Sequence, residues 1–327
     1  MSNKRRMATD KEDTPPETSD EKIIAFMKLR TMATALSIIL LLGSALSLAV
    51  NGIKWGLDFT GGTQVELFYE NAIDISLIRD LLANDGHPDA IVKESGSANN
   101  ILVTISGDDA ELGHRVAKIL DTNHDGHIEV KRVEYVGPQV GEKLREQGGL
   151  GMLLALLLVM LYIAFRFQFK FSVGAVTALT HDTIIVLGVF SLLELQFDLT
   201  VLAAILAVIG YSLNDTIIVY DRIRENFRKR RKGDAIEIIN ISLSQTLGRT
   251  LATSGTTLMV LLSLFLFGGE MIHNFATALI VGIGVGTYSS IYIASNLLLY
   301  MKVDREDLVV SVPKEEAEES EESEEVE

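Results

Sequence analysis

The chain has 327 residues, of which 48% are hydrophobic, and yet it carries a formal net charge of −15. A high hydrophobic content and a large negative charge are compatible because the acidic residues are concentrated at the C-terminus, where residues 304–327 contain twelve carboxylates and two basic side chains. Residues 301–327 are therefore predicted to form an acidic disordered tail. The acidic balance disfavours nucleic acid as a partner, and the absence of cysteine excludes disulfides and thiolate chemistry.

The N-terminal region combines a basic tail with a long apolar run. Residues 1–30 hold seven Lys or Arg, and residues 31–50 are almost entirely apolar. A secretory signal peptide is the competing interpretation, because 47–49 resembles a cleavage site. The apolar run is longer than the ~7–15 residues of a signal core and matches the ~20 residues of a span. A retained transmembrane helix is therefore favoured.

Residues 51–147 are polar and have the length of one compact domain. Residues 62–69 alternate apolar and polar side chains like a strand, and 75–82 have apolar residues at helical spacing. The remaining predicted elements are strands at 90–93 and 101–106, a helix at 110–120 and a strand at 128–136. The order β-α-β-β-α-β predicts an extracytoplasmic α+β domain of the ferredoxin-like kind.

Five further apolar runs follow, each close to the length of a membrane span. They cover about 148–165, 172–192, 199–220, 250–267 and 274–299, so six transmembrane helices are predicted. Lys and Arg fall in the loops on one side of the membrane, including seven between 222 and 232, and the short opposite loops around 194 and 270–273 have none. The positive-inside rule then places both termini in the cytoplasm and 51–147 outside.

Asp215 is the first candidate for function, because it lies within the apolar run 199–220. A carboxylate at membrane depth costs several kcal/mol unless it is paired, hydrated or protonated. Tyr211, Ser212 and Asn214 form a polar strip around it that should face the bundle interior. The alternative is a helix that leaves the membrane early and places Asp215 at the interface.

Arg249, at the start of the fifth span, is the natural partner of Asp215. Thr253, Thr256 and Thr257 follow it at helical spacing and are predicted to form a hydroxyl stripe. An ion pair between Asp215 and Arg249 is geometrically possible. An arginine that extends to the lipid headgroups is an equally good interpretation.

Three other features of the sequence can be interpreted either as functional or as purely structural. His181 and Asp182 interrupt the third span, which suggests a relay or hydrated cavity, or alternatively a structural pair. The segment 222–248 contains an amphipathic stretch that is predicted to be a connector along the cytoplasmic interface or an ordinary connecting helix. The small residues of the sixth span indicate a packing surface.

No set of residues typical of an enzyme is recognisable, so an enzyme is not expected. There is no serine-histidine-acid set, no phosphate-binding glycine loop and no zinc spacing. Residues 121–126 imitate the start of a calcium loop, but Arg132 stands where a bidentate glutamate should be, so a polar turn is favoured and no metal or cofactor is predicted.

Several stretches together resemble the SecD/SecF family of bacterial protein-export subunits, and within it the SecF branch. They occur in the order that the family requires over most of residues 20–300. These stretches are Gly56-Leu-Asp-Phe-Thr-Gly-Gly-Thr63, Val136-Gly-Pro-Gln-Val-Gly141, Ala178-Leu-Thr-His-Asp182, 211–226 and Arg249-Thr-Leu-Ala-Thr-Ser254.

The resemblance implies a half-sized member of the resistance-nodulation-division superfamily in the bacterial inner membrane. Its expected partners are SecD, with which it would form a twelve-helix bundle, the SecYEG translocon, unfolded preproteins, accessory inner-membrane subunits and the lipid bilayer. The coupling ion would be a proton or sodium. The resemblance assigns ion coupling to Asp215 and Arg249, and we expect support from Asn214, Tyr211, Ser212, His181, Asp182, Thr253 and Asp221.

The expected mechanism follows from charge. Ionised Asp215 is attracted to Arg249 or to water, and protonated Asp215 is not, so spans four and five can repack when the proton binds. Spans one and two flank the external domain, so a tilt of these spans would move it. One alternative is a half-subunit of a lipid or small-molecule exporter of the same superfamily. Another is a passive translocon scaffold, in which the charge of Asp215 would be unimportant.

Overall fold

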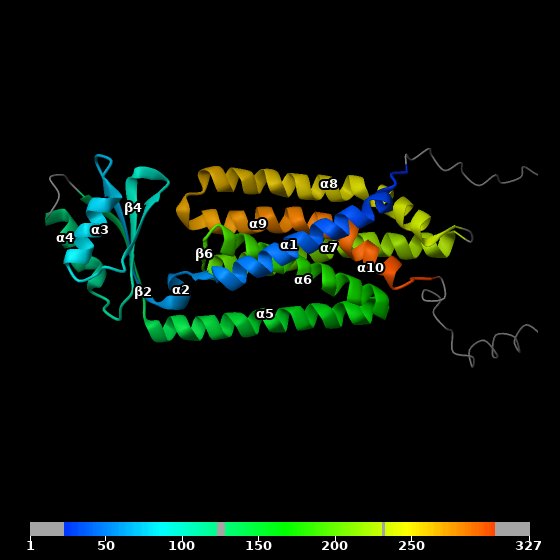
Figure 1. The fold of residues 1–327 in the computed structure, drawn as a ribbon, viewed down its shortest axis with the longest axis horizontal. Helices are drawn as coiled ribbons and strands as arrows, with labels where there is room; N and C mark the ends of the chain where they lie inside the picture. Colours follow the sequence, from blue (N-terminus) through cyan, green and yellow to red (C-terminus); the bar gives the residue numbers. More distant parts are fainter. Residues whose placement is uncertain (1–22, 123–127, 231–232, 305–327) are drawn as a thin grey trace, which may run out of the picture.

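The computed structural model describes residues 23–122, 128–230 and 233–304, so residues 123–126 of the calcium-like loop and most of both tails lie outside the described residues. A bundle of long helices carries a small α+β domain at one end (Figure 1). The described part contains six helical segments that are long and apolar enough to span a membrane, as predicted. The bundle helices are η1 (Phe26–Leu29) with α1 (Arg30–Val50), α5 (Pro138–Arg166), α6 (Phe169–Leu192), α7 (Leu199–Lys229), α8 (Ala235–Phe267) and α9 (Glu270–Ser289), which continues through a π-helical turn, η2 (Ser290–Ala294), into α10 (Ser295–Tyr300).

The bundle has a buried centre and an apolar exterior. Helices α6, α7 and α9 are buried along much of their length, whereas α1, α5 and α8 lie at the periphery. The peripheral helices expose large apolar side chains, for example Leu153 on α5 and Met259 on α8. Apolar side chains on the outside of a bundle suit hydrocarbon rather than water. The chain is therefore a multi-pass membrane protein.

The predicted connector 222–248 is not a separate element. Helix α7 extends without a break to Lys229, and α8 starts at Ala235 and continues through the fifth span. Gly233 has a φ of +135° between them, which a residue with a side chain rarely adopts. Asn226 on α7 donates hydrogen bonds to Ser242 and Gln245 on α8, so the two extensions pack against each other.

The α+β domain has the predicted order of elements. They are β2 (Gly62–Tyr69), α3 (Ile75–Asn84), β3 (Ile91–Ser95), β4 (Ser97–Ile105), α4 (Leu112–Thr122) and β5 (Ile128–Val136). The sheet order is β3-β4-β2-β5 with every neighbouring pair antiparallel. Alternate residues of β2, namely Val65, Leu67 and Tyr69, are buried in the domain core. Helices α3 and α4 complete this core on one face of the sheet (Figure 1).

Truncating a core residue of α3 should destabilise this domain. Ile78 is 0% exposed, so Ile78→Ala removes buried methyl groups, and we expect a loss of ~2–5 kcal/mol. Leu77, its neighbour on the same helix, is 47% exposed and serves as the control through Leu77→Ala. Amide exchange of β2 and β4 in the full chain should speed up for the first variant only. Equal exchange in both variants would contradict this core.

The stability of the domain should also fall at high pH. Burial raises the pKa of Tyr69 to about 12, above the ~10 of an unfolded tyrosine. The folded state therefore holds this proton more tightly, and the stabilisation is complete below pH ~10 and is lost as the pH rises through 12. Phenolate absorbance of the wild type minus that of Tyr69→Phe should rise near pH 12. A difference that rises near pH ~10 would contradict the burial.

Candidate ion-coupling site

The carboxyl group of Asp215 lies inside the bundle with few polar partners. The residue is in the middle of α7 and is 1% exposed. Its Oδ2 accepts a long hydrogen bond of 3.5 Å from the Ser254 hydroxyl, and its Oδ1 has no hydrogen-bond partner among the described residues. Because a bare carboxylate is costly in such surroundings, the arrangement suits a group that binds and releases a cation.

Hydroxyl groups from three helices meet at Ser254, the hydrogen-bond partner of Asp215. Ser254 on α8 shares a 2.9 Å hydrogen bond with Thr287 on α9. Tyr211, one turn before Asp215 on α7, donates a 3.5 Å hydrogen bond to the same serine. Ser254 therefore connects α7, α8 and α9 at the level of the buried carboxyl group.

The structure does not bring Arg249 to Asp215. Arg249 and Thr253 lie on an exposed side of α8, and no ion pair joins Arg249 to Asp215 in the described part of the chain. The Thr253 hydroxyl donates to backbone carbonyls of its own helix. The neighbouring hydroxyl residues Thr250 and Ser254 face inward instead, each one residue further along and thus rotated by ~100°. Sequence spacing alone did not fix this rotation.

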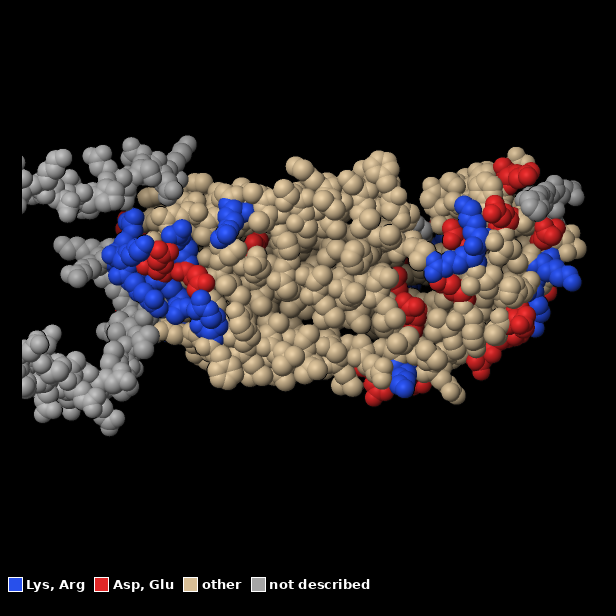
Figure 2. Space-filling view, turned by 180° about the vertical axis from the view of Figure 1, so that it is seen from behind, with Lys and Arg blue, Asp and Glu red and all other residues tan. Residues whose placement is uncertain are grey.

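Two other predicted residues lie away from the buried site. Asn214 is exposed on the face of α7 that does not carry Asp215. Asp221 lies near the basic end of α7, where it pairs with Arg166 at 3.4 Å and Arg224 at 3.7 Å. Figure 2 shows a cluster of Lys and Arg side chains at this end of the bundle, whereas the domain at the other end carries both basic and acidic side chains.

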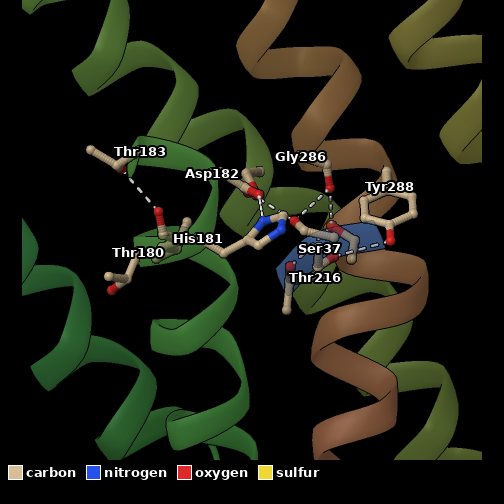
Figure 3. A network of polar contacts seen from close by, with 12 residues as sticks. Ser37, Thr180, His181, Asp182, Thr183, Thr216, Gly286 and Tyr288 are labelled. Carbon is tan, nitrogen blue, oxygen red and sulfur yellow. Dashed lines mark hydrogen bonds and ion pairs between the residues drawn. The ribbon is translucent and has the colours of Figure 1, made fainter. Parts of the chain in front are cut away.

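His181 and Asp182 form a second buried polar group. They are 3% and 1% exposed, and the His181 Nδ1 and Asp182 Oδ1 atoms are 3.0 Å apart. Asp182 Oδ2 accepts hydrogen bonds from Ser212 on α7 at 2.6 Å and from Ser289 on α9 at 2.8 Å. Figure 3 shows this network at the contact of α6, α7 and α9.

Helix α9 contributes more than packing. Thr287 is hydrogen-bonded to Ser254, the partner of Asp215, and Ser289 donates to Asp182. Ser290, just after α9, bonds to Thr216 of α7 at 3.1 Å. The π-helical turn η2 begins at Ser290, and the Tyr220 hydroxyl donates to the Ala294 carbonyl within it. The hydroxyl side chains at 287, 289 and 290 are the sequence signal for these polar contacts. The glycines that precede them made helix packing the simpler interpretation.

The domain-side end of α7 is attached to the segment that enters the α+β domain. Strand β1 (Lys54–Trp55) pairs in parallel with β6 (Gln196–Phe197), just before α7. Asp58, in the short helix α2 (Leu57–Thr60), accepts the N–H of Leu199 at 3.0 Å. Leu199 opens α7, whose N-cap is Asp198, so Asp58 supplies an acceptor for a further N–H of the first turn from a distant part of the chain. We call this contact region the junction.

Close backbone approach explains two glycines of the junction. The Gly56 N–H donates to the Phe197 carbonyl at 2.8 Å, and a Cβ at Gly56 would lie 2.9 Å from the Asp198 Cβ. Gly61 has a φ of +70°, and its Cβ would lie 2.6 Å from Pro138 Cα, at the start of α5. The junction therefore joins the ends of α5 and α7 to the domain.

Aromatic rings fill the junction. Trp55 packs edge-on against Phe59, with ring centroids 5.4 Å apart, and against Phe197, with centroids 5.6 Å apart. The Arg145 guanidinium of α5 lies 6.0 Å from the Trp55 ring centroid. Such contacts hold the domain entry against both helices.

Comparison with known proteins assigns this arrangement to a family. Residues 115–304 match the family described as "Protein export membrane protein SecD/SecF, C-terminal", and residues 46–72 match the "SecD/SecF GG Motif". The chain belongs to the SecD/SecF family. The junction glycines Gly56 and Gly61 lie within the matched motif, and both buried carboxyl groups lie within the longer match.

Its SecF relatives match over nearly their whole length. The protein translocase subunit SecF of Pseudomonas aeruginosa is 53% identical over 88% of this chain and 94% of the relative. The subunit of Vibrio alginolyticus is 48% identical over 91% and 96%, and that of Escherichia coli O157:H7 is 44% identical over 88% and 91%. These findings confirm the resemblance to protein translocase subunits.

Solved SecDF structures share the fold. The crystal structure of SecDF from Thermus thermophilus, a translocon-associated membrane protein, superposes with a TM-score of 0.78 at 37% identity over 85% of this chain. SecDF in its super-membrane-facing form gives a TM-score of 0.64 at 38% identity over the same share. This chain spans 38% of the length of each SecDF chain.

Proposed function

We propose that this chain pairs with a SecD subunit in the bacterial inner membrane and uses an ion gradient to assist preprotein translocation through SecYEG. The observation that carries the proposal is the buried Asp215 carboxyl group, which has one long hydrogen bond and one unpartnered oxygen. A passive scaffold has no need of such a group, because it costs stability. An energy-coupling subunit needs one whose charge state can change.

Asp215 is the proposed switch. Its ionised form attracts Arg249 or water, and its protonated or sodium-bound form does not. The membrane potential supplies ~2.3 kcal/mol per charge per 100 mV, which is enough to bias a two-state element. The Ser254 hydroxyl would follow the change because it donates to this carboxyl group, and the Thr287 hydroxyl would follow because it is hydrogen-bonded to Ser254.

Arg249 takes part in the other state of this cycle. It is exposed on α8, one residue from the inward-facing Thr250, so a rotation of α8 would turn it towards α7. Helix α8 lies at the periphery, and few of its apolar side chains beyond Ser254 are buried. The part of α8 up to Ser254 carries buried side chains, among them Leu243 and Thr250, so the rotation would repack this part against its neighbours, whereas the part beyond Ser254 has little buried surface to repack.

The junction would carry this movement to the α+β domain. It joins α7, which bears Asp215, to the domain through β1·β6 pairing and the Asp58 hydrogen bond. A cleft of about 460 Å³ separates the sheet from the domain-side ends of the helices, and Gln64, Arg132 and Asn274 are among its lining residues. Movement of the domain would open or close this cleft, which we propose contacts emerging preprotein.

The orientation follows from charge. The basic end in Figure 2 is the proposed cytoplasmic side, and the α+β domain is proposed to lie in the periplasm. The function is tested by translocation assays in membrane vesicles in which the proton and the sodium gradients are collapsed separately. One of the two collapses should remove the contribution of this chain. If neither collapse affects it, ion coupling is excluded.

A further inference from the structure

The imidazole of His181 has one buried nitrogen that the protein does not satisfy. His181 is 3% exposed, and its Nε2 has no hydrogen-bond partner among the described residues. Its Nδ1 faces the carboxylate of Asp182 at 3.0 Å. Figure 3 shows the ring between Asp182 of α6 and the side chains of α7, α9 and Ser37 of α1.

The hydrogen bonds fix where the protons of this pair lie. Asp182 accepts from Ser212 and Ser289 at one oxygen and faces the imidazole with the other. A carboxylate that accepts several hydrogen bonds is held in its ionised form and can only accept. The Nδ1 of His181 therefore carries the hydrogen, and the free lone pair of the neutral ring is on Nε2.

We propose that His181 Nε2 is a second proton-binding site, separate from Asp215. A proton that arrives from water forms an N–H bond at Nε2 and converts the ring to an imidazolium. Asp182 already faces the ring, so the new charge is paired at once and the dyad changes from negative to neutral. The inference rests on the proposed function only for what the bound proton does afterwards.

The surroundings favour a proton over an alkali cation. Among the residues that the structure describes, the titratable groups that face the imidazole are Asp182 on α6 and Tyr288 on α9, whose ring stacks on it with centroids 6.3 Å apart. Helix α7 presents Ser212 and Thr216 there, and both hydroxyls are engaged in hydrogen bonds. Hard cations need several free oxygen ligands, whereas the free acceptor here is a nitrogen.

The site is coupled to Asp215 through two shared helices. On α7, Ser212 bonds to Asp182 and lies three residues before Asp215. On α9, Ser289 donates a hydrogen bond to Asp182, and Thr287 is hydrogen-bonded to Ser254, the partner of Asp215. Protonation of the dyad would weaken its hold on Ser212 and Ser289, and so would loosen α7 and α9 beside Asp215.

Nuclear magnetic resonance of ring-labelled histidine tests the proposal in the complete SecD-containing complex in lipid vesicles. The signal of His181 is identified by its loss in His181→Gln. Spectra are recorded over a range of pH. We expect a neutral ring with an unprotonated Nε2 at high pH and an imidazolium at low pH. Asp182→Asn should remove the imidazolium form, and Asp215→Asn should leave the change in place.

Two outcomes would overturn the inference. A ring that keeps one protonation state across the range would make the dyad a static structural pair. Displacement of the bound proton by added sodium at constant pH would make the site an alkali-cation site. The measurement needs no translocation, so if Asp215→Asn translocates normally while His181 still titrates, the proposed function fails and this proton site stands.

Discussion

Asp215→Asn is expected to abolish the gradient-dependent part of preprotein translocation in a protein that still folds and assembles. The amide has nearly the volume of the carboxyl group and can still accept the hydrogen bond from Ser254. It carries no charge in any state, so the gradient has nothing to act on. We expect at least a tenfold loss, or ~1.4 kcal/mol, measured as protease-protected preprotein in energised membrane vesicles.

Asp221→Asn is the matched control. It makes the same substitution six residues further along α7, where the side chain is 44% exposed and pairs with Arg166. Exposed ion pairs contribute only ~0–1 kcal/mol, so translocation should be nearly normal. If both variants translocate equally well, the charge of Asp215 is unimportant and the scaffold interpretation is correct.

Asp58→Ala is expected to separate the helix bundle from the α+β domain without unfolding either part. The substitution removes the acceptor for the Leu199 N–H, a capping interaction worth ~0.5–2 kcal/mol. Amide exchange at the start of α7 should therefore accelerate about 2–30-fold. Gradient-dependent translocation should fall severalfold, and translocation without a gradient should be unchanged.

Asp74→Ala is the control for the loss of a helix cap. Asp74 is the N-cap of α3 within the domain and accepts the Ser76 N–H at 2.9 Å, so this substitution also removes a carboxylate acceptor from an N–H of a first helical turn. It lies away from the junction and should affect exchange in α3 alone. If Asp58→Ala accelerates exchange in α7 but leaves gradient-dependent translocation intact, the junction is structural and does not transmit movement.

The sequence was sufficient for features that depend on local pattern. Six apolar runs predicted the six spans because hydrocarbon demands a continuous apolar surface, whatever the neighbouring helices do. The alternation in 62–69 predicted a strand, since one face of β2 is buried in the domain core. Asp215 stood out for the same reason, as a charge in a segment that otherwise suits lipid.

Features that depend on rotation and long-range contact were not predictable in this way. Ser254 faces the bundle and Arg249 does not, because of the side on which α8 packs against α7 and α9. Spacing along one helix does not encode which side that is. Strands β1 and β6 have two residues each, which is too short for a periodic signal, and their paired residues are 142 positions apart in the sequence. The role of Ser289 depends on which helix lies opposite it, and small residues are also typical of plain packing surfaces.

The aromatic junction gives the chain an optical reporter of its own. Trp55 is the single tryptophan of the 327 residues, and it lies between Phe59 and Phe197 under the guanidinium of Arg145. Indole emission depends on nearby charge and on contact with solvent, and this ring is 38% exposed. Any displacement of the domain relative to α7 would therefore change the fluorescence of one known residue, so motion could be followed without attaching a dye.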